Sequence, residues 1–284
     1  MTIRYPILSA ILVTAIWGLN VVAIKVGVTE VSPALFNLLR FSLLSLILSP
    51  FFRVPRTALK PLIALSLLMG IGHFYLLSVG ASYVDSNTAV IIIMLGAPIS
   101  SLLVFLMGLE QLSRTQVAGV IAAFIGAAMP LLLNGSIDLQ IGAVFLVTAM
   151  VAWACTNIYV RRLKDVSIIS FQFWIGFVTT PICLAAWLME GDGTSLLQQL
   201  NIRVLAAVIY MVLFSSIIAY GLWFATISQH GVNKVVNITL LQPAFTMLFA
   251  YLILHDLPTR AQLFGGTITI LGIYLYYFRS LKRH

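Results

Sequence analysis

The chain has 284 residues, of which 61% are hydrophobic and only 8% are charged, and its mean hydropathy is +1.07. A water-soluble protein of this length cannot hide so much apolar surface in its core, so a soluble enzyme or binding domain is excluded. The formal charge of +8 is spread over short polar segments and does not form one face, which argues against a nucleic-acid partner.

Apolar stretches long enough to cross a bilayer follow one another along the whole chain. A span needs about 20 apolar residues, because the hydrocarbon core is roughly 30 Å thick and a helix rises about 1.5 Å per residue. A closed barrel would need alternating segments, which runs such as Ile121–Leu133 do not show. We therefore expect an all-α integral membrane protein with ten transmembrane helices, near residues 6–28, 33–52, 61–81, 87–107, 115–133, 139–160, 168–189, 203–226, 233–254 and 260–279.

Basic residues between the expected spans gather on one side of the membrane. Only Arg203 and Arg260 fall on the other side. By the positive-inside rule, this asymmetry predicts a multi-pass protein of the cell (inner) membrane with both termini in the cytoplasm. The twelve residues on the cytoplasmic side are Arg4, Arg53, Arg56, Lys60, Arg114, Arg161, Arg162, Lys164, Lys234, Arg279, Lys282 and Arg283.

The two halves of the chain share residues at nearly constant spacing. Each half holds five expected spans, and because five is odd the second half enters the membrane from the opposite side. We expect two inverted five-helix repeats, residues 1–137 and 138–284, around a central cavity in one membrane domain. Shifts of 145 or 146 overlay Tyr75 on Tyr220, Pro98 on Pro243, Gln116 on Gln262, Gly119 on Gly265 and Gly126 on Gly272, and a shift of 136 overlays Trp17 on Trp153.

The paired prolines and glycines have a physical use. Pro98 and Pro243 fall in the middle of the fourth and ninth expected spans, where each removes a backbone hydrogen bond and kinks the helix. They are candidates for shaping or hinging the helices that open and close the cavity. The paired glycines lie seven residues apart on one helix face, where they allow neighbouring helices to approach closely.

Several of these residues resemble the drug/metabolite transporter superfamily. They are the Trp-Gly-x-Asn run at Trp17–Asn20, the segment Phe36–Arg40, and Pro98 followed by Glu110, Gln116, Gly119 and Gly126. Over its whole length the chain is similar to the ten-helix EamA-type exporters, and within them to the bacterial aromatic amino-acid exporters. His255-Asp256 departs from the pattern, since members often carry a Glu there. The resemblance implies a transport function, two inverted five-helix repeats and a central cavity.

All eight acidic residues fall in expected loops or at their edges. Coupled transporters commonly use an intramembrane Asp or Glu, and this chain offers none clearly within a span. The sequence therefore predicts neither a carboxylate relay nor an acidic clamp for a cationic drug. Uniport, exchange or coupling through a histidine remain open.

Three residues within the expected spans can carry a positive charge: Arg40, Lys25 and His73. Lys25 lies near the outer end of the first span, where it can reach the interface. Arg40 either anchors a carboxylate-bearing substrate or bonds to backbone carbonyls and holds helices together. His73 lies near the midplane and can be buried neutral. One possibility is that His73 contacts the substrate or takes part in gating the cavity. The other is that it makes a hydrogen bond between two packed helices. No second ligand stands at metal spacing, so we expect no metal site.

Aromatic and amide side chains are unusually common at mid-span positions. Indole and amide N–H groups at that depth need a neighbouring helix or a wet cavity as partner. Either they are bonded structurally one by one, or they line one cavity suited to a neutral or zwitterionic ligand with an apolar body. The candidate substrate-binding residues are Trp17, Asn20, His73, Tyr75, Trp153, Asn157, Tyr220, Trp223 and Asn237.

We expect a membrane transporter that exports small metabolites by alternating access, with amino acids, including aromatic and other neutral ones, as preferred substrates. Export of nucleosides, purines or neutral drugs is the alternative on the same fold. A channel would show non-saturating flux. An intramembrane enzyme would need a nucleophile, an acid–base pair or a metal set. The sequence has no His-Glu-x-x-His motif and no carboxylate within a span, and a lone histidine among hydroxyls gives this alternative only weak support. We expect no catalytic residue and no cofactor.

Overall fold

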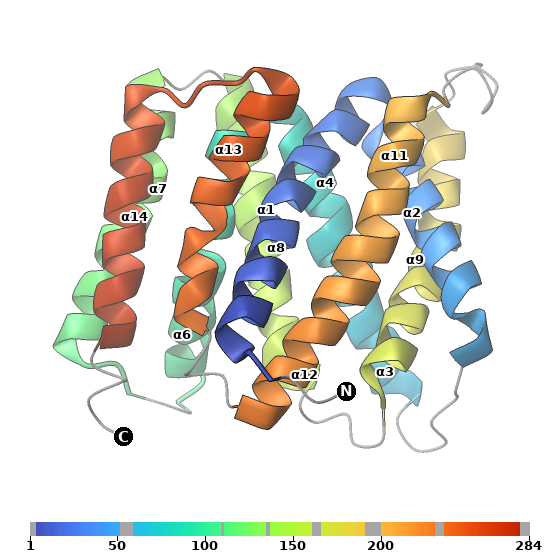
Figure 1. Ribbon diagram of the computed structural model, residues 1–284, viewed down its shortest axis with the longest axis horizontal. Coiled ribbons are helices and arrows are strands. Elements are labelled where there is room, and N and C mark those ends of the chain that lie inside the picture. Colours follow the sequence, from blue (N-terminus) through green and yellow to red (C-terminus); the bar gives the residue numbers. More distant parts are fainter. Residues whose placement is uncertain are drawn as a thin grey trace.

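The computed structural model describes residues 4–51, 59–108, 111–134, 137–160, 166–190, 200–230 and 236–278. Within these ranges the chain is helical and forms no strand, which confirms the all-α expectation. The helices stand side by side in one bundle (Figure 1). In chain order they are α1 (Pro6–Glu30), α2 (Pro33–Leu48), η1 (Ser49–Phe51), α3 (Leu59–Leu67), η2 (Leu68–Tyr75), α4 (Leu76–Tyr83), α5 (Ser86–Ile93), α6 (Gly96–Leu106), α7 (Arg114–Asn134), α8 (Ile137–Val160), α9 (Ile168–Glu190), α11 (Ile202–Tyr210), η3 (Met211–Ala219), α12 (Tyr220–His230), η5 (Val236–Leu241), α13 (Gln242–Leu254) and α14 (Arg260–Phe278).

Eight continuous helical runs are long and apolar enough to cross a membrane, each near one of the first eight expected spans. The ninth expected span forms a shorter apolar helix, Ile238–Leu254, and the tenth forms α14. The chain is therefore a multi-pass membrane protein. The eight runs are Pro6–Glu30, Pro33–Phe51, Leu59–Tyr83, Ser86–Leu106, Arg114–Leu133, Ile137–Tyr159, Ile168–Glu190 and Ile202–Trp223.

Helix α1 occupies a central position in the bundle. It packs against α4 and α5 of the first half of the chain and against α11, α12 and α13 of the second half. Its contact with α13 is close, because a Cβ added at Gly18 would lie 2.7 Å from the Phe245 Cβ. The Thr246 hydroxyl also donates to the Gly18 carbonyl oxygen at 3.0 Å. Residues in the middle of α1 therefore face elements from both halves.

In the fourth and ninth expected spans the α-helical pattern is interrupted next to the proline, although the chain stays helical through the interruption. Helix α5 ends at Ile93 and α6 begins at Gly96, so Pro98 lies in the first turn of a new helix. In the second half, the 3₁₀ segment η5 is followed by α13, and Pro243 lies in the first turn of α13. Met94 and Leu95, between α5 and α6, keep right-handed helical backbone angles. Pro98 has no N–H and makes no hydrogen bond to the preceding turn, and both irregularities lie next to the prolines that the sequence singled out.

Two helical runs contain a π-helical segment at matching positions. The segment η2 spans Leu68–Tyr75, and a shift of 145 carries these residues to 213–220, which overlaps η3 at Met211–Ala219. Segments of π-helix are rare and occur frequently at functional sites. Nothing in an apolar run distinguishes such a segment from an α-helix, so sequence analysis missed both.

Helices α7 and α14 cross at the glycines that pair between the halves. An added Cβ at Gly119 would lie 2.6 Å from the Gly272 carbonyl oxygen, and one at Gly126 would lie 2.5 Å from that of Gly265. The two helices run antiparallel and start alike. Ser113 and Gln116, like Thr259 and Gln262, exchange side-chain and backbone hydrogen bonds in a capping box.

We expect Gly126→Ala to destabilise the protein by about 1–3 kcal/mol, because its methyl group would meet backbone atoms of α14 that have no room to move. The loss should appear although alanine favours a helix by about 1 kcal/mol over glycine. Gly221→Ala on α12 is the matched control, since nothing lies within 4 Å of its added Cβ. Thermal unfolding in detergent checks both, and equal melting temperatures would refute the close crossing.

Candidate functional site

The indole ring of Trp17 lies between two aromatic rings of the second half of the chain. Its centroid is 5.4 Å from that of Tyr220 and 5.5 Å from that of Trp223, with tilted ring planes in both pairs. Trp17 stands near the middle of α1, roughly 16–20 Å from either end at about 1.5 Å per residue. Three of the candidate substrate-binding residues thus meet deep in the bundle, and they come from both halves.

Trp153 on α8 joins this group through Tyr220. Its indole and the Tyr220 hydroxyl are hydrogen-bonding partners. A Cβ added at Gly96 would lie 3.3 Å from the Trp153 ring, so the start of α6 packs directly on the indole. We call Trp17, Trp153, Tyr220 and Trp223 the aromatic cluster.

Arg40 is buried beside the aromatic cluster, with 1% of its surface exposed. Its Nη2 donates to the Ser216 hydroxyl of η3 at 3.3 Å, and its guanidinium carbon lies 4.2 Å from the Phe74 ring centroid of η2. Tyr220 and His73 are both within electrostatic range of this cation. Arg40 therefore links the two π-helical segments, through a hydroxyl and a ring rather than through the carbonyls considered from the sequence.

His73 on η2 makes a hydrogen bond to α8. Its Nδ1 lies 3.1 Å from the Ala149 carbonyl oxygen. A carbonyl only accepts, so Nδ1 carries the proton and donates, and in the neutral ring Nε2 is left as an acceptor. The His73 ring also lies 4.7 Å from the Phe74 ring. The helix–helix bond foreseen for His73 is present, and one ring nitrogen remains for other contacts.

Buried polar atoms near the aromatic cluster have no protein partner within the described part of the chain. They are Nε1 of Trp17, Oδ1 of Asn20, and Nε and Nη1 of Arg40. A buried polar group without a partner is costly, and such groups often mark places where a ligand completes the hydrogen bonding. Three hydrogen-bond donors and one acceptor near the aromatic cluster are thus available to a ligand.

Other candidate residues lie differently. Tyr75 is half-buried and packs against the hydrophobic core. Asn157 is exposed and donates to the Trp153 carbonyl of its own helix at 2.8 Å. The Asn237 side chain lies outside the described residues. Pro98 and Pro243 are both buried at the helix interruptions. Phe74 was missed, because a phenylalanine within an apolar run carries no sequence signal.

Several polar side chains from both halves of the chain interact near the α13–α14 connection. Lys25 of α1 donates to the Ala81 carbonyl at the end of α4 at 3.0 Å. Asp85, which caps α5, accepts from the Gln262 side chain at 2.9 Å. Partial burial and the neighbouring Asp85 carboxylate raise the pKa of Asp256, and Lys25 opposes this shift. These contacts hold this end of the bundle together.

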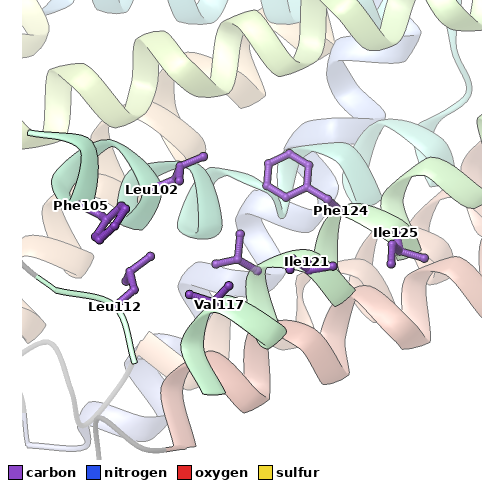
Figure 2. A pocket seen from close by; sticks show the side chains of 8 residues that line it. Leu102, Phe105, Leu112, Val117, Ile121, Phe124 and Ile125 are labelled. Carbon is purple, nitrogen blue, oxygen red and sulfur yellow. The ribbon is translucent and has the colours of Figure 1, made fainter. Parts of the chain in front are cut away.

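A groove of about 440 Å³ lies between α6 and α7, on the surface of the bundle (Figure 2). Ile121 and Ile125 in its wall are more than half exposed. No polar side chain lines the groove, which suits lipid chains and offers nothing to a polar substrate. The lining residues are Leu102, Phe105, Leu112, Val117, Val120, Ile121, Phe124 and Ile125.

Groups of three or more His, Cys, Asp or Glu side chains that could hold a metal ion do not occur among the residues described by the structure. The polar atoms near the aromatic cluster are indole, amide, hydroxyl and guanidinium groups. Together with the His73 imidazole, such groups can bind and orient a ligand.

The chain is similar to several named relatives along almost the whole length of both sequences. The chain is 28% identical to a "Probable amino-acid metabolite efflux pump" of Salmonella typhimurium, with 95% of this chain and 93% of the relative covered. It is 27% identical to a protein of the same name in Escherichia coli, with the same coverage. A "Probable terminal-alkyne amino-acid exporter" of Streptantibioticus cattleyicolor is 25% identical, covering 100% of this chain and 97% of the relative.

A solved crystal structure has the same fold, with a TM-score of 0.64 at 14% identity over 98% of each chain. The family model of the EamA-like transporter family matches this chain twice, at residues 4–132 and 140–278. These matches confirm the resemblance inferred from the sequence motifs and make transport the class of function. The chain belongs to the EamA-like transporter family.

Proposed function

We propose that this transporter exports amino acids, including aromatic and other neutral ones, across the cell's inner membrane by alternating access. The observation that carries the proposal is the aromatic cluster of Trp17, Trp153, Tyr220 and Trp223, deep in the bundle and drawn from both halves of the chain. Rings at this depth offer an apolar substrate body large contact surfaces. The names of the relatives as amino-acid exporters support the same substrate class.

The proposal includes ten crossings arranged as two inverted repeats, residues 1–137 and 138–284. Four paired features support it: the π-helical segments, the interruptions before Pro98 and Pro243, the two capping boxes, and the reciprocal glycine contacts of α7 and α14. The double match to the family also agrees with it. Two halves that pack on one site can rock against each other and expose it to either side in turn.

The proposed substrate-binding residues are Trp17, Asn20, His73, Tyr75, Trp153, Asn157, Tyr220, Trp223 and Asn237. The interruptions at Pro98 and Pro243 are proposed as the hinges. A proline has no N–H to donate, so a helix can change direction next to it without breaking a hydrogen bond at that residue.

An even number of crossings puts both chain ends on the same side of the membrane, and the distribution of basic residues favours the cytoplasm. In Figure 1, α1 begins and α14 ends at the same end of the bundle. We expect tags on both termini to be protected in intact cells. In a chain with Cys155 and Cys183 replaced, Arg203→Cys should react with a membrane-impermeant thiol reagent from outside, and Arg114→Cys only after lysis. Labelling of both positions from the same side would refute the inverted arrangement.

Expression in bacteria lacking their own aromatic amino-acid exporters tests the proposed function in the cell. We expect the chain to raise resistance to fluorinated phenylalanine and to speed the release of labelled phenylalanine from loaded cells. Release no faster than with an empty vector, from cells whose membranes hold the folded protein, would contradict amino-acid export. Parallel resistance tests with toxic nucleosides and purines then cover the alternative substrates.

A further inference from the structure

The feature that reaches beyond the proposed function is a buried cation with unused donors. Arg40 is 1% exposed, and its Nε and Nη1 have no hydrogen-bond partner within the described part of the chain. Its contacts are one hydroxyl, Ser216, and the rings of Phe74 and Phe41 at 4.2 and 5.2 Å from the guanidinium carbon. Hydrogen bonds to a charged guanidinium are among the strongest in proteins, so the unused N–H groups favour an anionic partner.

The described helices offer this cation no anionic partner of their own. Glu30 and Glu190 are the last residues of α1 and α9, and Asp138 is the second residue of α8. Asp85 caps α5, and Asp256 lies in the connection between α13 and α14. Every described carboxylate therefore stands at a helix end or in a connection. A ligand's carboxylate would find a cation at this depth, whereas its ammonium group would find no carboxylate.

The surroundings of Arg40 determine what else the ligand carries. The Phe74 ring lies 4.2 Å from the guanidinium carbon. Tyr220 is within electrostatic range of the guanidinium and contacts Trp17 of the aromatic cluster at a ring distance of 5.4 Å. An apolar environment strengthens the attraction between a guanidinium and a carboxylate, because little water screens it. Aromatic surface next to a single cation suits a ligand with an aromatic body and one negative charge.

We propose that Arg40 is a carboxylate-binding residue and that this transporter accepts aromatic monocarboxylates whether or not they carry an α-amino group. The proposal rests on the proposed function for the location of the site, and it adds which group of the substrate is recognised. N-acyl aromatic amino acids and arylalkanoic acids are therefore ligands. Aromatic amines and amides that lack the carboxylate are excluded.

A ligand series on the unmodified protein tests this directly. Binding of labelled N-acetyltryptophan to purified protein is measured by equilibrium dialysis, with tryptophan, indole-3-acetate, tryptamine and tryptophanamide as competitors. We expect tryptophan and indole-3-acetate to compete, and the two compounds without a carboxylate to bind at least about tenfold more weakly. Equal competition by tryptophanamide, or no binding of N-acetyltryptophan, overturns the proposal.

Variants locate the effect at Arg40. Arg40→Gln should lower N-acetyltryptophan affinity by at least about tenfold and remove the preference over tryptophanamide. Arg40→Lys keeps the charge and should retain part of that preference. Arg203→Gln is the matched control, because Arg203 is 74% exposed and pairs with Glu30 at 3.1 Å at the surface of the bundle. Elution as a single folded species is required of each variant. An unchanged preference in folded Arg40→Gln overturns the assignment, and if that variant misfolds the ligand series decides.

These binding measurements, combined with a measurement of tryptophan export, separate this inference from the proposed function. Arg40-dependent binding of N-acetyltryptophan without tryptophan export leaves carboxylate recognition standing and removes amino-acid export. Tryptophan export together with equal binding of tryptophanamide leaves the proposed function standing and removes carboxylate recognition.

Discussion

Trp17→Ala is expected to lower tryptophan affinity by roughly 30- to 1000-fold, since a large buried aromatic contact is worth about 2–4 kcal/mol at a binding hot spot. Trp17 contacts both Tyr220 and Trp223, so its loss opens the aromatic cluster on the α1 side. The helix itself should persist, because alanine is a strong helix former and the neighbouring Gly18 contact with Phe245 is unchanged. Transport of labelled tryptophan into vesicles containing the purified variant measures the effect.

Tyr83→Ala is the control for Trp17→Ala. Tyr83 stacks on Phe145 with ring centroids 6.2 Å apart, but it is 43% exposed at the end of α4 and touches no member of the aromatic cluster. We expect normal transport from this variant. Equal losses from both variants would mean that the Trp17 effect is a general consequence of removing an aromatic pair.

His73→Ala is expected to reduce transport about tenfold or more, because it removes the buried hydrogen bond between η2 and α8 together with the Nε2 atom that is free to meet a substrate. Two conservative variants separate the two roles foreseen for this histidine. His73→Asn keeps an N–H donor near Nδ1, which holds the Ala149 carbonyl. His73→Gln places its amide near Nε2, which is the nitrogen free to meet a substrate.

Rescue by Asn alone would assign His73 to the helix–helix contact, and rescue by Gln alone would assign it to the substrate. Initial rates at saturating and at low tryptophan concentrations make the distinction sharper. A positioning role lowers the maximal rate, whereas a lost substrate contact raises the half-saturating concentration. Full transport by His73→Ala at normal protein level would remove His73 from the site.

The location of the helices was predictable from sequence because a bilayer imposes one length and one polarity on every span. What the sequence could not show is how the backbone is bonded within a span. The residues Leu68–Tyr75 have the same apolar character in an α-helix and in the π-helix that they form. Likewise Pro98 marked an irregularity, but only the structure places it in the first turn of α6.

The candidate site was predicted in part. The structure brings together Trp17, Tyr220, Trp223 and Trp153. The sequence could single these residues out because aromatic side chains at mid-span are easily distinguished from the surrounding Leu and Ile. Asn157 shares a helix face with Trp153 by periodicity, yet its exposed side chain bonds to its own helix. A four-residue spacing predicts that two residues share one face of a helix. It does not predict which neighbouring helix covers that face, because this depends on packing between segments that are distant in the sequence.

The partner of Arg40 could not be foreseen for the same reason. Ser216 is 176 positions away along the chain, and Phe74 is one of 17 phenylalanines in a mostly apolar sequence. Only the packing of η2 and η3 against α2 brings a hydroxyl and a ring to this cation.

Counterflow in proteoliposomes tests the central claim most directly. Purified protein is reconstituted with unlabelled phenylalanine or tryptophan inside, and labelled tryptophan is added outside without an ion gradient. The account predicts saturable uptake that is stimulated by the internal amino acid, as a carrier that alternates between two openings requires. Uptake by the folded protein that equals that of empty liposomes, or that rises linearly with concentration and ignores the internal amino acid, would contradict it.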